Sequence, residues 1–428
     1  MTALSSGVSA ARADTSSEEN DRKRHAPAVS QKAVQDGVQA RGTAEEVRVL
    51  SAGLRSPTGV TNQTPGGGLL PSSDDAAMVS GANRDFIAKQ APTSNLFSLM
   101  QMAPGVTVAK TDPLGVSDRS NVMIRGMQQN EIGWEFEGMP ADDQINHVAD
   151  SSEWSDSENI GHFEIRQGSP DMTAPVLNAV GALVSSSLRD PSLQKGGYIG
   201  SSFGTNNAFR EFLRLDSGEI GHTGIRNFTS FSYTTNDNWR GPGNNTRYHV
   251  DSKFVKEWGN GNRIAAVVTY NRLQNAWQNY LTLSQWQQYG THYNLATSFK
   301  SGKANYYELW INRRSRVMIS LPSHFNLGHG LSLTATPYYF WMSGSVPNGT
   351  TLSNTGSYSG TEPAGNLGLD NLTNGSGVVA AMAAGYTFSS GITTGLAYRT
   401  GINLLEVGAW YNNVDRRAIT SYAAVGAN

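Results

Sequence analysis

The stretch NVMIRGMQQNEIGWEFEGMP, residues 121–140, contains two short runs of alternating apolar residues, each ended by a charged residue and a glycine. Arg125 and Gly126 end the first run, and Glu137 and Gly138 end the second. Alternation with a period of two is typical of β-strands with one buried face. A single charge and glycine pair is more often a plain strand end, so the stretch alone is compatible with a β-hairpin of a soluble domain.

The neighbouring sequence predicts a small α+β domain over residues 76–191. A short helix is expected after Thr93 or Ser94, either of which can cap it, and Pro104 ends it. Further strands are expected at residues 106–108, 163–166 and 179–185.

From residue 196 onward, alternating segments of roughly ten residues are separated by clusters of Asn, Asp and Gly. Tight turns that alternate with long polar loops favour an antiparallel transmembrane β-barrel over a sandwich. Five aromatic residues are expected near strand ends, where the aromatic girdle of a barrel would lie, although aromatics at strand ends also close soluble sandwiches. They are Tyr338, Tyr339, Trp341, Trp410 and Tyr411.

The composition narrows the classes of partner and site. Lysine and arginine number 33 against 35 acidic residues, for a net charge of -2, and no basic block points to nucleic acid. The absence of cysteine excludes disulfides and thiolate metal sites. The sequence has no run of 18 apolar residues, so we expect no membrane-spanning helix. It also contains no catalytic motif, so we expect neither an enzyme nor a cofactor.

The order of motifs resembles that of the TonB-dependent outer-membrane receptors. NVMIRG (121–126) resembles the IRG strand of their plug domain, and FEGMP (136–140) resembles a strand that reads acidic residue, glycine, hydrophobe and proline. IGHFEIRQGSP (160–170) and NAVGALV (178–184) stand where the family has its next two plug motifs. The resemblance implies a set of plug-motif residues: Arg125, Gly126, Glu137, Gly138, Pro140, Arg166 and Gly168.

One departure concerns the arginine of the third motif. The family places Arg directly before the glycine, whereas Gln167 precedes Gly168 here and Arg166 lies one position earlier, on the other face of a strand. In the family, two plug arginines face carboxylates of the barrel wall. The resemblance carries that role to Arg125 and leaves it open for Arg166.

The resemblance implies an α+β plug domain followed by an antiparallel transmembrane β-barrel. A complete barrel of this family has about 22 strands, and residues 192–428 suffice for about 9–12, which predicts an incomplete barrel in a chain truncated at both ends. The expected order is a disordered export or tether remnant (1–44), a TonB-box-like segment (45–55), a linker (56–75), the plug (76–191) and the partial barrel (192–428).

The segment EEVRVLSA resembles the family's energy-coupling box, which would add a strand to the TonB energy-coupling protein and transmit its pull to the plug. Its residues are Glu45, Glu46, Val47, Arg48, Val49, Leu50, Ser51 and Ala52.

The acidic run HVADSSEWSDSE (147–158) favours a solvated loop. A hard cation held by Asp150, Glu153, Asp156 and Glu158 is the alternative, although the spacing is not that of an EF-hand. If the plug assignment holds, the loop would face ligand through His147, Asp150, Glu153 and Asp156.

The resemblance therefore predicts a receptor of the bacterial outer membrane that takes up a scarce solute, with a ferric siderophore as the family's commonest cargo. Its partners would be outer-membrane lipid, the TonB protein and that small ligand. Two alternatives stay open: a soluble or surface-attached β-rich module that binds glycans through its Trp and Tyr residues, and a receptor fragment without function of its own.

Overall fold

A computed structural model describes residues 53–69, 78–110, 114–116, 120–144, 146–168, 170, 172–278, 281–356, 358–359, 361–363, 365–369 and 377–425. All of them belong to one compact unit, Gln39–Asn428. The predicted tether (1–44) and Glu45–Ala52 of the TonB-box-like segment lie outside the described residues.

The first sheet has five strands in the order β1-β6-β7-β4-β5. Its pairs are antiparallel except β4 with β7, which run parallel. The strands are β1 (Met78–Asn83), β4 (Ile132–Phe136), β5 (Met139–Pro140), β6 (Ile160–Gln167) and β7 (Ala182–Leu188). This α+β unit is the plug that the sequence predicted.

The stretch 121–140 is not a hairpin, because its two strands belong to different sheets. β3 (Asn121–Ile124) pairs with β2 (Val106–Ala109), and β4 pairs with β5 and β7. The 3-10 helix η3 (Gln129–Glu131) separates β3 from β4.

Two short α-helices pack on this sheet, α2 (Arg84–Ile87) and α3 (Leu96–Met100). The residue that caps α3 is Asn95, whose Oδ1 accepts a hydrogen bond from Ser98 N, so the caps predicted at Thr93 and Ser94 are wrong. The Phe97 ring stacks on Trp134 with the ring centroids 5.2 Å apart. Burial of such rings contributes about 1.5–3 kcal/mol each, which makes this pair a large part of the plug core.

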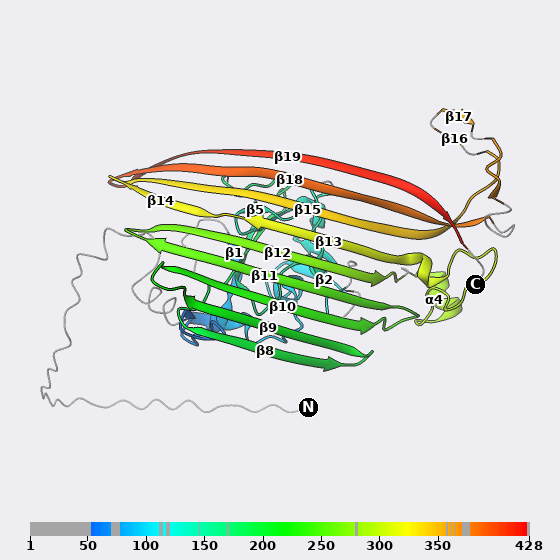
Figure 1. Ribbon diagram of the computed structural model, residues 1–428, viewed down its shortest axis with the longest axis horizontal. Coiled ribbons are helices and arrows are strands. Elements are labelled where there is room, and N and C mark those ends of the chain that lie inside the picture. Colours follow the sequence, from blue (N-terminus) through cyan, green and yellow to red (C-terminus); the bar gives the residue numbers. More distant parts are fainter. Residues whose placement is uncertain are drawn as a thin grey trace, which may run out of the picture. The chain divides into compact units, whose positions relative to one another are not determined.

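The second sheet has ten strands, and Figure 1 shows them side by side from β8 to β19 with the plug strands behind. We call this sheet the wall. Its main path is β8-β9-β10-β11-β12-β13-β15-β18-β19, and β14 pairs with β12 and β15. The strands are β8 (Lys195–Gly204), β9 (Ala208–Glu219), β10 (Ile225–Asp237), β11 (Asn244–Trp258), β12 (Asn262–Ala276), β13 (Ile311–Ser320), β14 (Ser323–Gly328), β15 (Leu331–Thr351), β18 (Val378–Thr400) and β19 (Asn403–Ala424).

The last three long strands exceed the predicted length of about ten residues. β15, β18 and β19 have 21, 23 and 22 residues, whereas roughly 9–11 residues cross a bilayer. The prediction for the five aromatics was wrong for the same reason. Tyr338, Tyr339, Trp341, Trp410 and Tyr411 lie inside β15 and β19, because each strand continues in register with β18 beyond the segment that alternates clearly.

The wall has two long connections at the same end. One spans residues 277–310 and contains α4 (Leu283–Tyr289) and the 3-10 helix η5 (Tyr307–Trp310). The other spans 352–377 and contains β16 (Tyr358–Ser359) and β17 (Glu362–Pro363). Short turns such as Gly401 and Ile402 occupy the opposite end. Among the described helices, none is long and apolar enough to cross a membrane.

Candidate functional site

The predicted solvated loop is buried between the plug and the wall. Exposed fractions are 2% for Ser151, 4% for Glu153 and 6% for Asp156, so the expectation of a solvated run was wrong. The 3-10 helix η4 (Ser151–Glu153) and the residues up to Asn159 lie against side chains of β9 to β13.

Each carboxylate of this run meets an arginine of the wall. Asp156 Oδ1 lies 2.7 Å from Arg247 Nη1, and Glu158 Oε1 lies 2.7 Å from Arg210 Nη1. Glu153 Oε2 lies 2.9 Å from Arg316 Nη1, and Asp150 pairs with Arg314. We call these eight residues the seam. Because arginines pair with these carboxylates, hydrogen-bonded ion pairs stand where the sequence analysis had considered a cation site as the alternative to a solvated loop.

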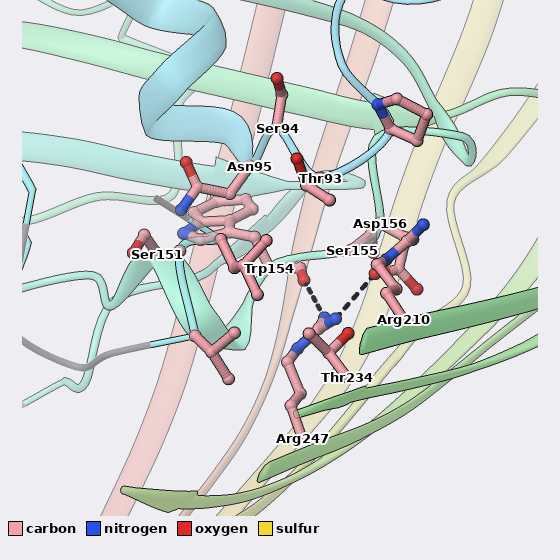
Figure 2. A pocket seen from close by; sticks show the side chains of 14 residues that line it. Thr93, Ser94, Asn95, Ser151, Trp154, Ser155, Asp156, Arg210, Thr234 and Arg247 are labelled. Atoms are coloured by element: carbon pink, nitrogen blue, oxygen red, sulfur yellow. Dashed lines mark hydrogen bonds and ion pairs between the residues drawn. The ribbon is translucent and has the colours of Figure 1, made fainter. Parts of the chain in front are cut away.

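Arg247 makes the densest set of contacts in the seam. Figure 2 shows its guanidinium reaching the plug, where Nη2 donates to Trp154 O at 2.6 Å and Nη1 donates to Asp156 Oδ1. Its Nε donates to Ser152 O at 2.8 Å. The adjoining cavity of about 20 Å³ has room for roughly one water. A single wall side chain therefore holds three alternate residues of the plug segment, Ser152, Trp154 and Asp156.

A second buried network lies next to Arg247. His249 Nε2 lies 2.8 Å from Asp251 Oδ1, which also accepts from Ser155 Oγ at 2.9 Å. Asp251 Oδ2 accepts from Asn159 Nδ2 at 2.8 Å. Asp156, His249 and Asp251 bring possible metal-ligand atoms within 4.8 Å of one another, but the seam arginines already bind Asp156 Oδ1, and His249, Ser155 and Asn159 bind both oxygens of Asp251. This network of hydrogen bonds therefore joins the plug to the wall.

The second charge and glycine motif joins the plug to the wall. Glu137 has φ +48, and its Oε1 accepts from Leu188 N and Lys253 Nζ, both at 2.8 Å. Lys253 also pairs with Asp190 at 3.1 Å. Gly138 has φ +76 and approaches Thr336 on β15, so the turn fits closely beneath the wall.

The first motif behaves differently. Arg125 is exposed, its N donates to Gly105 O, and its Nη2 lies 2.8 Å from Met78 Sδ. Within the described residues it makes no ion pair with a wall carboxylate. Gln167, which stands where the family has arginine, is buried and donates from Nε2 to Pro104 O. Arg166 lies on the alternate face of β6, where the side chain is partly exposed.

The remaining predicted site residues lie within the plug. Pro140 is buried in β5, and Gly168 has φ +101 with no atom within 4 Å of an added Cβ. His147 is half-buried, and its Nδ1 lies 2.7 Å from Asp142 Oδ2. Burial raises the pKa of Asp142 from its ordinary value, against the opposing hydrogen bond from His147.

The described part of the predicted linker is tied to the plug. We call residues 54–64 the strap. Leu54 O accepts from Leu193 N, Pro57 O accepts from Arg189 Nη2, and Thr58 O accepts from Arg84 Nε.

Asp85 holds the other end of the strap. Its carboxylate accepts from the backbone and hydroxyl of Thr61 and from the backbone and hydroxyl of Thr64. Burial alone would raise the pKa of Asp85, but these hydrogen bonds lower it below its usual range. Sequence reasoning missed the strap because Gly, Pro, Ser and Thr are typical of a linker whether or not it is bound.

Wall arginines were also missed, although a sequence signal exists. Arg210 and Arg214 on β9 are four residues apart, and Arg314 and Arg316 on β13 are two residues apart. In a strand, either spacing puts both members of a pair on one face.

Two comparisons bear on the family and the fold. The TonB-dependent Receptor Plug Domain matches residues 71–181. Among curated protein sequences, none matches this chain.

Solved structures share the fold at low sequence identity. The pyoverdine outer membrane receptor FpvA from Pseudomonas aeruginosa PAO1 is 14% identical, with a TM-score of 0.63 over 83% of this chain and 50% of that one. The ferric citrate transporter FecA is 13% identical, with a TM-score of 0.61 over 82% and 49%. The siderophore receptor PiuA from Acinetobacter baumannii is 14% identical, with a TM-score of 0.55 over 83% and 49%.

The chain spans about half the length of these structures. The plug and the ten-stranded wall confirm the predicted fold class, an α+β domain followed by a large antiparallel sheet. Proteins of the TonB-dependent receptor family lie in the outer membrane and are receptors rather than enzymes. The chain therefore carries, over residues 71–181, the plug domain of the TonB-dependent receptors, and it has the fold of these outer-membrane proteins.

Proposed function

We propose that the protein takes up a scarce solute across the outer membrane in a TonB-dependent manner, and that the solute is a ferric siderophore. The seam is the observation that carries this proposal. It holds the plug against one face of the wall through buried ion pairs, which supports a plug that blocks passage. A solute can pass only when some of these contacts open.

The class of solute is supported by the similar structures. FpvA is described as a pyoverdine receptor, FecA as a ferric citrate transporter and Fiu as a ferric-catecholate import receptor. These proteins share the fold and take iron chelates, which favours the same class here. The seam carboxylates are paired with the wall, so ligand contact through Asp150, Glu153 and Asp156 would require an opened seam.

The TonB protein would act through Glu45–Ala52. An extended segment of this kind can add a strand to a partner's sheet. The strap begins two residues after Ala52, and its carbonyls bind Arg84 and Arg189 of the plug. Pull on the segment would therefore first load the contacts of Leu54 O with Ser192 and Leu193, and then these two arginines.

Deletion of the gene in its source bacterium tests the proposal. Uptake of ⁵⁵Fe-labelled siderophores should fall, and the wild-type gene should restore it. Val49→Pro removes a backbone donor from the coupling segment and should abolish the restoration, whereas the matched control Val29→Pro should restore uptake fully.

Membrane fractionation checks the location in the same strains. The proposal requires the wild-type protein and both variants in the outer-membrane fraction. Recovery as a soluble periplasmic protein would refute it and favour the glycan-binding module. Equal uptake with Val49→Pro and Val29→Pro would refute the coupling role of Glu45–Ala52.

A further inference from the structure

A cavity of about 160 Å³ lies between the strap, the plug and the first strands of the wall. Its lining includes the six residues on which the following depends: Thr58, Arg84, Glu158, Arg189, Tyr198 and Arg214. Tyr198 and Arg214 come from β8 and β9, and the others come from the strap and the plug. The volume is enough for several waters or a small ion.

The carboxylates near the cavity are already engaged. Arg214 binds both oxygens of Asp216, at 2.8 and 3.0 Å. Arg210 binds both oxygens of Glu158, at 2.7 and 2.9 Å. Because each of these carboxylates binds one arginine through both oxygens, little negative charge remains to compensate the other arginines of the cavity.

Arg84 and Arg189 lack such a partner. Arg84 donates to the carbonyls of Thr58 and Ser157, and within the described residues no carboxylate lies within 4.0 Å of it. Arg189 is about nine-tenths buried, donates to Pro57 O, and comes no closer than 3.8 Å to Asp216. Its buried Nε has no hydrogen-bond partner among the described residues.

The electrostatics agree with this geometry. Burial and repulsion from Arg214 lower the pKa of Arg189 to about 8. Burial likewise lowers the pKa of Arg84 to about 10, although Glu158 opposes the shift. Both buried guanidinium groups thus have too little negative charge nearby to compensate their positive charge. An arginine side chain in a protein stays protonated, so the imbalance remains.

We propose that this cavity binds a small oxyanion of the phosphate class between Arg84 and Arg189. A guanidinium presents parallel N–H donors that match phosphate oxygens, and the unpartnered Nε supplies one such donor. We call this the anion pocket.

The pocket would connect the strap to the plug. Gly59 of the strap fits between the two arginines, since a Cβ there would lie 3.1 Å from Arg84 Cγ and from Arg189 Nη1. A bound anion would hold both guanidinium groups in the positions from which they bind Pro57 O and Thr58 O. Occupancy would therefore strengthen the attachment of the segment that precedes the plug.

Calorimetric titration of the full chain in detergent with inorganic phosphate, at constant ionic strength, tests the site. We expect saturable binding, with chloride inert. Arg189→Gln should weaken binding about tenfold or more, because a charge-assisted hydrogen bond contributes about 1.5–3 kcal/mol. Arg399→Gln, at an exposed arginine of β18, should leave the affinity unchanged.

Two further measurements keep the test decisive. Arg189→Lys keeps the positive charge, so this variant should fold even if Arg189→Gln misfolds. It loses the paired N–H donors of the guanidinium group, so it should bind phosphate more weakly than the wild type. Amide hydrogen exchange at residues 58–60 should slow on adding phosphate to the wild type. Absence of saturable binding, or the same affinity in wild type and Arg189→Lys, would overturn the proposal.

Discussion

Nζ of Lys253 lies 2.8 Å from Oε1 of Glu137, although 116 positions separate the two residues in the chain. Glu137 follows β4 in the plug, and Lys253 is on β11 of the wall. Both are buried, and the positive φ of Glu137 turns the chain at this point. The second charge and glycine motif of residues 121–140 is therefore part of the contact between the plug and the wall.

Replacing Lys253 by methionine should destabilise the protein. Glu137 would lose its cationic partner, and Asp190 would keep only Arg263. Loss of one partner from a buried ion pair costs about 3–5 kcal/mol. Denaturant unfolding in detergent measures the change, with Lys256→Met on an exposed position of the same strand as the control. Equal losses in both variants would contradict the role given to Lys253.

Arg247→Gln should loosen residues 150–159. The variant loses the charged contacts to Asp156 and to two plug carbonyls. Amide hydrogen exchange in this segment should accelerate about tenfold or more, since 1.4 kcal/mol corresponds to a factor of ten. The control is Arg272→Gln, because Arg272 is exposed on the neighbouring strand β12. Unchanged exchange in Arg247→Gln would show that the seam does not hold the plug segment.

The two motif glycines should differ in their tolerance of alanine. Gly126 and Gly138 both have positive φ, so each substitution costs about 1–2 kcal/mol in backbone strain. At Gly138 the new Cβ would also lie 3.2 Å from Thr336 Cγ2, whereas nothing lies within 4 Å at Gly126. We expect about 1 kcal/mol more destabilisation at Gly138. Thermal unfolding compares the variants, and Thr336→Ser in the Gly138→Ala background should remove the difference.

The strap should detach in acid. The pKa of Asp85 is lowered in the folded state, so its contribution to stability is complete above the ordinary pKa of 3.8 and falls as the pH drops below that value. Proteolysis of residues 54–64 should be slow at pH 7 and faster near pH 3. Asp85→Asn should make cleavage fast at pH 7 also, and Glu406→Gln, at an exposed site on β19, should not. A strap equally protected at pH 7 in Asp85→Asn would refute the attachment.

Local patterns predicted much of the fold. Alternation of apolar residues located β4, β6 and most wall strands, because burial of one strand face leaves a period of two in the sequence. The ends of β15 and β19 were not predictable in this way. Residues 342–351 of β15 and 413–424 of β19 show no clear alternation of apolar and polar side chains, and backbone pairing with β18 extends both strands.

The candidate site was less accessible to sequence reasoning. The run 147–158 has the composition of a solvated loop, and its carboxylates are buried only because wall arginines meet them from 52 to 164 positions away. No local signal specifies such partners. The TonB-box-like segment and the ligand contacts stay predictions.

By itself, the sequence determined the order of the parts: a plug whose motifs match those of a receptor family, followed by strands with alternating faces. These properties follow from local propensity and periodicity. Only the tertiary structure decided that β3 and β4 lie in different sheets, that the acidic run pairs with the wall arginines of the seam, and that the strap covers two arginines without a bidentate carboxylate partner. These relationships depend on groups that are distant in the chain and that meet only when the plug packs against the wall.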